Sequence, residues 1–505
     1  MATNKVTSIG DSIETPMRAY NVAQSFLALP NTLLGGTEAM RAAGKLYLPQ
    51  EEGESELKYE ARLARTTLLE VYGRTIEKLV GEMFRVPVNI TDDVDDEIKE
   101  WLDDIDRRGR NLTAFCVDLM EAGVHEGIVH LLVDYPRSPG ATVEAHKKAG
   151  ARPYWVVIRG SQLIGWRFTE TNAGPNLTQA RILEKHQVDD GLYGEKTVDR
   201  VRLLEPGKWA VYEAGDAGWT LAKYDDGTPM QGTTNLDYIP LFTIRCGRAT
   251  GEMTAKPPLL PLAHLNHQHW QSSSDQRNIL HYARLVTWFG RMIQEDDDGR
   301  VLIGANRMVR SDSPNGDLKV VEHSGAAISA GRQDLEDLKT EMSMFGLSLM
   351  IGKTGGVTAT ERAIDKGEND SSLARWVRSL NSALWKALET TCKYVGKEPA
   401  GELNASDDFS GILRSQDPQT IIQAYEAGLI TREVAIEELK VRGLITQEID
   451  LVELVRQLEE DQKRSNPEMD VLKGAFGGLK SIQDGQGTPP LNQDPQAGQA
   501  GWNMQ

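Results

Sequence analysis

The stretch KPPLLPLAHLNHQHWQSSSDQRNILHYAR, from Lys256 to Arg284, predicts one long helix around which the rest of the chain is organised. Proline is tolerated in the first turn of a helix, so we expect the helix to be entered through the Pro257–Pro258 pair. After Pro261, neither Pro nor Gly occurs until Gly290. About 24 residues at a rise of 1.5 Å each would form a rod of about 36 Å.

This helix lacks the continuous apolar stripe that would dock it on a hydrophobic core along its length. A helix that is polar nearly all round needs water or neighbours of its own kind. Small hydroxyl and amide side chains suit close packing against identical helices in a ring, so the pattern favours a symmetric tube. The apolar residues at helical spacing are Leu262, Leu265, Leu280 and Ala283, and the polar residues in the middle of the same face are His269, Ser272, Ser273 and Gln276.

Length and charge restrict the class of protein. A chain of 505 residues is long enough for about three domains. A net charge of −18 and a pI near 5.1 argue against a protein that wraps nucleic acid tightly, because affinity for phosphates comes from Lys and Arg. An acidic wall would still let DNA slide past, as a conduit requires.

The three cysteines, Cys116, Cys246 and Cys392, stand far apart. Their spacing suggests neither a disulfide framework nor a zinc site, and a reducing cytoplasm is the expected compartment. The N-terminus has no apolar segment typical of a signal peptide, and no apolar run reaches the roughly 18 residues of a membrane span. We therefore expect a protein that acts in solution.

The first half of the chain predicts helices followed by strands. A polar N-terminal stretch leads into a helix from Ser55 to about Met83, and a short helix follows from Asp95 to Ile105. Asn111 is placed to cap a helix over 112–125. Seven apolar or alternating segments then predict an antiparallel meander, and helices before a meander indicate an α+β fold. After the buried strand IVHLLVDY (128–135), these segments are YWVVIR, LIGWRF, ARILEKHQV, VDRVRLL, KWAVYEA, WTLAKY and IPLFTIR.

The second half predicts a small strand module between long helices. Short strands at Arg284–Phe289, RVLIGANRMVRS and LKVVEHSG are broken by the acidic loop Glu295–Asp298, and a helix from Asp334 to Ile351 follows. This helix ends at the glycine-rich loop Gly352–Gly356, and a third long helix covers Thr360 to Val395. Short helices to about Glu460 precede a tail rich in Gly, Gln and Pro, a composition typical of flexible segments.

Gly352, Lys353 and Thr354 match only the end of a phosphate-binding loop. A helix precedes them where that motif needs a strand, and Leu347 stands where its first glycine belongs, so we interpret the segment as a plain glycine loop. His264 and His267 could share a helix face, but no Cys or carboxylate completes a metal site. No catalytic constellation is present, so we expect no enzyme activity, no metal and no cofactor.

Two other motifs have plain interpretations. The acidic run Glu295–Asp298 lacks the alternating ligands and glycine of a calcium loop, so a solvated loop tip is preferred. The segment AGLITREVAIEELKVRGL resembles a helix-turn-helix, but Glu433, Glu437 and Glu438 make a poor surface for a major groove. We interpret it as a helical packing module.

Several segments in consistent order, from about residue 45 to 445, together resemble the portal proteins of tailed bacteriophages, in a group long filed as a domain of unknown function. They are YLPQEEGESELKYEARLAR (47–65), VHLLVDYP, RPYWVVI, the long helix above, TATERAIDKGENDSSL and IQAYEAGLITREVAIEEL.

The resemblance implies a ring, typically of twelve subunits, at one vertex of a capsid. Each subunit would have an α/β wing, a two-helix stem, a small clip, a channel loop and a helical crown. The implied divisions are an N-terminal arm 1–44, wing 45–255, stem helix 256–284, clip 285–331, second stem helix 332–351, channel loop 352–360, long wing helix 361–400, crown 401–462 and flexible tail 463–505.

In such a ring, double-stranded DNA passes through without sequence specificity during packaging and ejection. Implied partners are identical subunits, the large terminase subunit docking on the clip, a head-tail adaptor, and the major capsid and scaffolding proteins. The resemblance places Lys353 and Thr354 on the channel loop. The stem's oligomer or channel face would carry His269, Ser273, Gln276, Arg277 and Arg284. The alternative function is a non-conducting adaptor or minor capsid protein.

Overall fold

The computed structural model describes most of the first 409 residues. Two compact units divide the chain, Met1–Ile412 and Leu413–Gln505, and every described residue belongs to the first. The predicted channel loop, the crown beyond residue 409 and the tail lie outside the described residues. Described are residues 12–137, 150–172, 174–215, 218–284, 287–293, 311, 313–321, 325–350, 371–407 and 409.

The segment expected as a polar arm is helical over much of its length. Three short helices form there, α1 (Arg18–Ser25), α2 (Ala28–Leu34) and α3 (Gly36–Ala43), followed by the turn η1 (Gly44–Leu46). The sequence pattern does not predict these helices, because the apolar side chains that define their buried face are widely spaced. Leu29, Leu33 and Met40 all join the main hydrophobic core.

The helix predicted from Ser55 to Met83 is two helices, α4 (Glu56–Arg65) and α5 (Val71–Met83). The chain is extended at Thr66, whose hydroxyl donates to the Arg62 carbonyl and lies 2.9 Å from Ser274 Oγ. A partner distant in sequence therefore sets the break. The remaining helices of this layer are α6 (Asp96–Leu102) and α7 (Leu112–Glu126).

The start and end of α7 confirm the predicted signals. The Asn111 side chain accepts a hydrogen bond from the Ala114 N–H at 2.9 Å, and Gly127 ends the helix with φ near 81°. The strand after it, β2 (Ile128–Asp134), is buried along nearly its whole length. Both features are local, which is why the sequence predicts them.

The strands form two principal sheets, so the prediction of one continuous meander is wrong. A three-stranded antiparallel sheet has the order β10-β2-β3, with β3 at Tyr154–Arg159 and β10 at Leu241–Arg245. One of its faces packs against both α7 and α12 (Ser372–Val395), which meet at Trp155, and Leu132, Ile158 and Leu241 on the other face pack against the larger sheet. The larger sheet is an antiparallel meander of β4 (Leu163–Thr171), β5 (Gly174–Asp190), β6 (Gly194–Glu205), β7 (Lys208–Gly215) and β8 (Gly218–Leu221), with β9 (Gln231–Thr233) beside β7.

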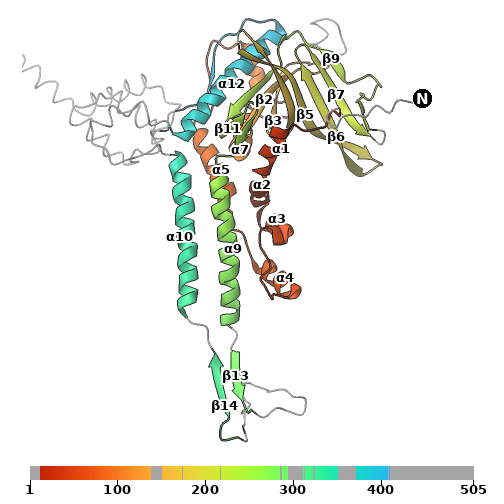
Figure 1. Ribbon diagram of the computed structural model, residues 1–505. Helices are drawn as coiled ribbons and strands as arrows, with labels where there is room; N and C mark the ends of the chain where they lie inside the picture. The colour runs from red at the N-terminus through yellow and green to blue at the C-terminus, as the bar shows by residue number, and fades with distance from the viewer. Residues whose placement is uncertain are drawn as a thin grey trace, which may run out of the picture. The chain divides into compact units, whose positions relative to one another are not determined.

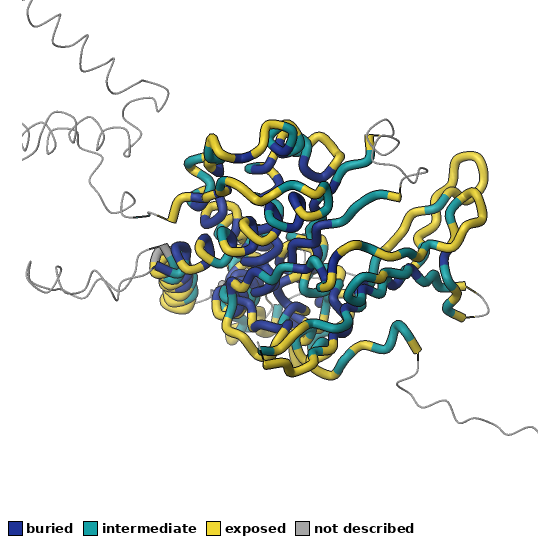
Figure 2. Tube along the Cα trace, turned by 90° about the horizontal axis from the view of Figure 1, so that it is seen from above, coloured by how far each residue is buried: buried dark blue, intermediate teal, exposed yellow. Residues whose placement is uncertain are grey.

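The core has two parts. The larger joins α2 to α7, the small sheet, the start of α9 (Leu260–Ala283) and α12, and the smaller lies between the small sheet and the meander. From above, buried residues gather at the centre while the long β hairpins reach outward and are exposed (Figure 2). Mixed helices and antiparallel sheets make the fold α+β, as predicted.

The two stem helices leave this core together. α9 packs against α10 (Gly325–Met350), and the strands β13 (Thr287–Arg291) and β14 (Asp317–Val321) pair antiparallel at the far end (Figure 1). β14 confirms the predicted strand LKVV, whereas RVLIGANRMVRS lies almost wholly outside the described residues. α10 begins seven residues before the predicted 332, so the two stem helices match in length.

Two small strand pairs complete the described elements. β1 (Asn89–Ile90) pairs with β15 (Leu403–Asn404), and β11 (Arg248–Gly251) pairs with β12 (Thr254–Lys256) directly before α9. The second pair brings the chain back to the core at the point where the stem begins.

Candidate functional site

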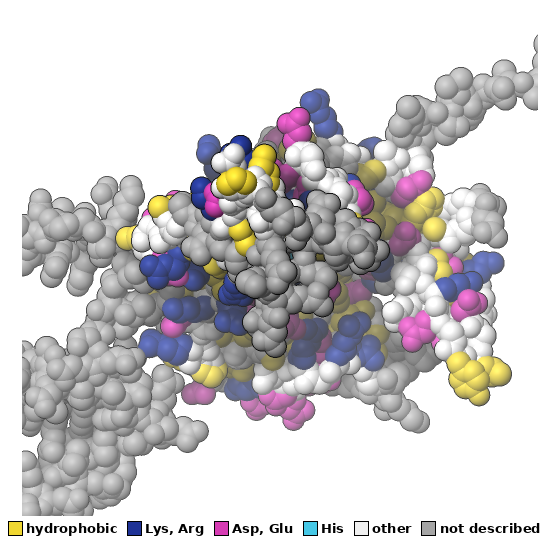
Figure 3. All heavy atoms as spheres, turned by 90° about the horizontal axis from the view of Figure 1, so that it is seen from below, with side chains coloured by type: hydrophobic (Ala, Val, Ile, Leu, Met, Phe, Trp, Pro, Cys, Tyr) yellow, Lys and Arg dark blue, Asp and Glu magenta, His cyan; other side chains and the backbone are white. Residues whose placement is uncertain are grey.

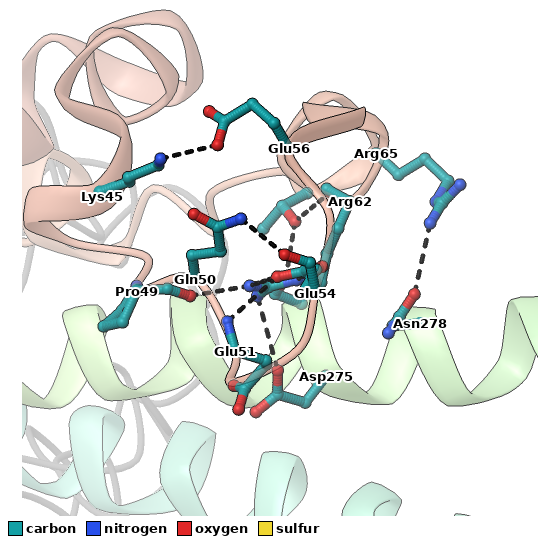
Figure 4. Close-up of polar contacts among 12 residues, drawn as sticks. Lys45, Pro49, Gln50, Glu51, Glu54, Glu56, Arg62, Arg65, Asp275 and Asn278 are labelled. Carbon is teal, nitrogen blue, oxygen red and sulfur yellow. Dashed lines mark hydrogen bonds and ion pairs between the residues drawn. The ribbon is translucent and has the colours of Figure 1, made fainter. Parts of the chain in front are cut away.

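The long helix α9 buries polar side chains on two faces. At 100° per residue, positions offset by two lie nearly opposite one another, so two polar stripes run along this one helix. Within this chain, α4 and α10 flank α9 from opposite sides (Figures 1 and 4). The polar stripe toward α4 and the preceding loop is His267, Gln271, Ser274 and Asn278. The polar stripe toward α10 is His269, Ser273 and Gln276, with Leu280 next along the same face.

Arg62 is the centre of the contact between α4 and α9 (Figure 4). Its side chain is only 3% exposed, and its guanidinium binds the Glu54 carboxylate in two places, at 3.0 and 2.9 Å. It also donates to the Pro49 carbonyl at 2.7 Å and to Ser274 Oγ at 3.4 Å. The hydrogen bonds from Arg62 hold the pKa of Glu54 below its usual value, so the pair is ionised. A buried charge needs such partners, because its desolvation is costly.

Weaker contacts extend this attachment along α9. The backbone carbonyl of Tyr47 lies 2.8 Å from His267 Nε2 and accepts from Gln271 Nε2 at 3.1 Å. One turn below Ser274, Arg65 donates to Asn278 Oδ1 at 3.3 Å. The loop before α4 and α4 itself therefore contact the middle of α9 at several points along its length.

Higher on α9, Asn266 connects the stem to the start of α5. Its side-chain oxygen accepts from the Tyr72 N–H at 3.1 Å, and its amide donates to the Leu69 carbonyl at 2.8 Å. The first N–H groups of a helix have no partner inside it, so Asn266 caps α5 from a distant element. This is a second reason why the chain breaks between α4 and α5.

On the opposite side, α9, α10 and residues Thr67–Leu69 enclose a groove of about 500 Å³. Gln276 donates to the Ile328 carbonyl at 2.9 Å, and Gly331 allows this close approach, since a Cβ there would lie 2.1 Å from Gln276 Oε1. His269 is 5% exposed, and burial lowers its pKa, with the charge of Lys339 acting in the same direction. Its imidazole is therefore neutral at pH 7.

The predicted stem-face residues are thus brought together on one helix, but three of them face this chain's own α10. His269, Ser273 and Gln276 are buried in the groove, Arg277 lines it at the surface, and Arg284 is exposed at the end of α9. Their predicted contact with a neighbouring copy or a channel stays a prediction. Lys353 and Thr354 lie outside the described residues.

The expectation that α9 cannot dock on a hydrophobic core is wrong for its upper half. The upper half of α9 docks on the core through Leu262, Ala263 and Trp270, and Asn266, Ser274 and Gln276 form hydrogen bonds to α5, to the end of α4 and to α10. A polar helix therefore does not by itself require identical neighbours. The sequence pattern did not identify Arg62 or Glu54 as site residues. No short-range pattern marks two charged residues, eight positions apart, that form a buried ion pair.

Charge on the stem is unevenly distributed. The groove lining includes the cations Arg277, Arg332 and Lys339 and no carboxylate. Figure 3 shows the described surface from below, where many Lys and Arg side chains gather among fewer Asp and Glu side chains. Over α9 with its C-cap Arg284 and over α10, four Lys and Arg residues stand against five Asp and Glu residues, so the positive charge is local to the groove lining.

Two properties of the described residues bear on the site. They contain no group of three or more His, Cys, Asp or Glu side chains that could hold a metal ion. Among the described helices, none is both long and apolar enough to cross a membrane.

Comparisons with known proteins find one matching family model and several similar solved structures. Residues 258–395, which include α9, α10 and α12, match the family model of a domain of unknown function, DUF4055. A search among curated proteins finds no match to this chain.

Solved structures similar to this chain come from gene transfer agent (GTA) particles. One is described as "Virion of native gene transfer agent (GTA) particle", with 14% identity, a TM-score of 0.38, and coverage of 74% of this chain and 89% of the other. A second is described as "Neck of native GTA particle computed with C12 symmetry", with 12% identity, a TM-score of 0.37 and the same coverage of 74% and 89%. A third, "Neck of empty GTA particle computed with C6 symmetry", has 14% identity, a TM-score of 0.37 and again that coverage.

Proposed function

We propose that this protein is a phage portal, a head-to-tail connector whose copies form a ring-shaped channel at one capsid vertex. In this proposal DNA passes through the ring during packaging and ejection, and the ring is the docking site for the terminase and for tail adaptors. The protein supplies a passage and a seat for other proteins and catalyses no reaction.

The observation that carries the proposal is the paired stem. α9 and α10 extend together from the core and end in the β13–β14 hairpin, and the lower turns of both helices are largely exposed (Figure 1). An isolated pair of helices gains little stability from its own contacts, so it needs further packing partners. Copies of the same chain around an axis parallel to the stem would supply them.

The sequence resemblance assigns the remaining parts. The α/β unit above the stem corresponds to the wing, and the β13–β14 hairpin lies in the predicted clip, where the terminase would dock. A few exposed stem cations such as Arg284 would face the DNA phosphates, and weak contacts from few cations suit a duplex that must slide.

A non-conducting adaptor or minor capsid protein is the alternative function. Such a protein would bind its neighbours through the same surfaces without surrounding DNA. The two functions differ in whether the assembled particle has an open bore.

Solution mass tests the proposal first. Purified full-length protein should form one species of fixed subunit number, resistant to dilution, in mass photometry and sedimentation velocity. A protein that stays a single subunit at every concentration would contradict the proposal.

Enzyme activity is tested separately. The purified protein should hydrolyse no ATP above the rate of a buffer blank, and Lys353→Ala should change nothing. Hydrolysis that is lost in Lys353→Ala would instead establish a nucleotide-driven enzyme.

A further inference from the structure

The groove between α9 and α10 contains buried polar atoms without partners. Among the described residues, neither ring nitrogen of His269 has a hydrogen-bond partner, and Gln276 Oε1 also has none. Both side chains are more than nine-tenths buried and line the groove. An unsatisfied buried polar group is costly, so the groove is suited to an occupant that brings polar groups of its own.

The rest of the lining defines the chemistry of that occupant. Leu69, Leu280, Ile328 and Leu335 supply apolar surface, and the lining cations Arg277 and Arg332 supply positive charge. The third lining cation, Lys339, is paired with Glu336 at 3.0 Å. An amphipathic segment with apolar and acidic side chains would complement both properties.

The outer face of α4 has this composition. Leu57, Glu60, Ala61 and Ala64 follow one another at helical spacing, and all four are exposed, Leu57 by 78%. The opposite face of α4 is already occupied, since Tyr59 and Arg62 are buried against the chain. Beside the stripe, three further glutamates are exposed, Glu51, Glu52 and Glu56.

The two surfaces lie at the same height on the stem and on different sides of it. Arg62 and Arg65 of α4 reach Ser274 and Asn278, while the groove spans α9 from His269 to Leu280. Figures 1 and 4 show α4 and α10 on opposite sides of α9. A rotation about an axis parallel to α9 keeps every atom at its height, so such surfaces can meet repeatedly around a ring.

We propose that α4 of each copy docks in the α9–α10 groove of the next copy, with Leu57, Ala61 and Ala64 against the apolar lining and Glu60 against its cations. This inference rests on the proposed ring and identifies the head-to-tail contact that closes it. The contact is heterologous, because two different surfaces of one chain meet.

Engineered cysteines test the contact directly. Ala64 and Ser329 are both exposed, one on the proposed docking face and one in the groove, and the native residues Cys116, Cys246 and Cys392 are buried. The double variant Ala64→Cys, Ser329→Cys, treated with a short bismaleimide, should give a ladder of linked subunits on a denaturing gel. Each single variant should remain a single-subunit band, because in the proposed contact position 64 of one copy faces position 329 of the next copy and not that copy's position 64.

A matched pair provides the control. Asp337 is exposed on α10 but does not line the groove, so the double variant Ala64→Cys, Asp337→Cys should give no ladder. Intact rings by mass photometry without a ladder from the first pair would overturn the docking contact and leave the proposed function standing. Equal ladders from both pairs, or dimers from a single variant, would also overturn it. A wild-type protein that forms no ring would remove both proposals.

Discussion

At the residue scale, one buried arginine attaches the stem helix to the N-terminal helices. Arg62 and Glu54 are 3% and 10% exposed and form two hydrogen bonds, while Arg62 also reaches Ser274 on α9. Removing one partner leaves the other charge buried without compensation, which costs far more than the net value of the pair.

We predict that Arg62→Met lowers the free energy of unfolding by about 3–5 kcal/mol, measured by urea denaturation at pH 7. The matched control Arg65→Met, whose guanidinium makes one 3.3 Å contact to Asn278, should cost less than about 1.5 kcal/mol. Adding Glu54→Leu to Arg62→Met should recover part of the loss, because it removes the stranded carboxylate. Equal losses for the two arginine variants would show that Arg62 has no special role.

A second residue-scale prediction concerns pH. Burial lowers the pKa of His125 from 6.5 to about 4, and its ring nitrogens lie 3.2 Å from Tyr72 Oη and 2.8 Å from Asn31 Oδ1. Below pH 6.5 the unfolded chain binds a proton that the folded chain does not, so stability should fall as the pH drops from about 6.5 to about 4.

The variant His125→Gln isolates this contribution. It should be less stable than the wild type at pH 7.5 and should lose less stability between pH 6.5 and 4, measured by urea denaturation across that range. His130 remains in both proteins and contributes a decline of the same sign, because burial also lowers its pKa. An unchanged decline in the variant would contradict the assignment to His125.

At the element scale, the start of the stem helix depends on close backbone contacts. The Gly127 carbonyl accepts from the N–H groups of Cys246 and Gly247, at 3.0 and 2.7 Å, where α7, β10 and the approach to α9 meet. A Cβ on Gly247 would lie 2.0 Å from the Lys256 carbonyl oxygen, so only glycine fits there without a backbone shift.

We predict that Gly247→Ala lowers the free energy of unfolding by about 1–3 kcal/mol through this clash. The control Gly81→Ala lies inside α5 with no atom within 4 Å of the new Cβ, and it should raise stability by up to about 1 kcal/mol. Thermal and urea denaturation of both variants provide the measurement. A Gly247→Ala protein as stable as the wild type would show that the junction tolerates displacement.

Local sequence signals predicted some of the helices and strands, whereas contacts between distant residues determined others. For α7, the capping Asn111 and the terminating Gly127 were predicted, and so was the alternation in the strands, because each of these signals lies within a few residues. The break at Thr66, the division of the strands into two sheets and the burial of α9 were missed. Each of these depends on a contact distant in sequence, such as Thr66 with Ser274 or α12 with β10.

The site was predicted in part for the same reason. His269, Ser273 and Gln276 were grouped correctly on one helix face because helical spacing is a local property. Their burial against α10 was not predicted, since the sequence does not show which helix packs on which face. Arg277 and Arg284 are at the surface, where a neighbouring copy or DNA would meet them.

At the scale of the whole molecule, opposite charges on two surfaces of one chain allow a charge exchange. Arg332→Glu places a carboxylate in a groove that should receive Glu60, and Glu60→Arg places a cation against the groove's cations. Each single variant should reduce the assembled fraction at least tenfold in mass photometry at low salt.

The double variant Glu60→Arg, Arg332→Glu should recover much of the assembly, because the charges again complement one another. Recovery shows that the two positions face each other, which a loss in each single variant alone does not show. A double variant that assembles no better than either single variant would contradict the proposed contact.

The central claim, that copies of this chain surround an open channel, is tested most directly by electron microscopy of the purified full-length protein. The account predicts end-on views of a closed ring with a bore of roughly 20 Å or more, the width of a duplex, and the α9–α10 pairs around it. A closed particle without a bore, or single subunits only, would contradict it.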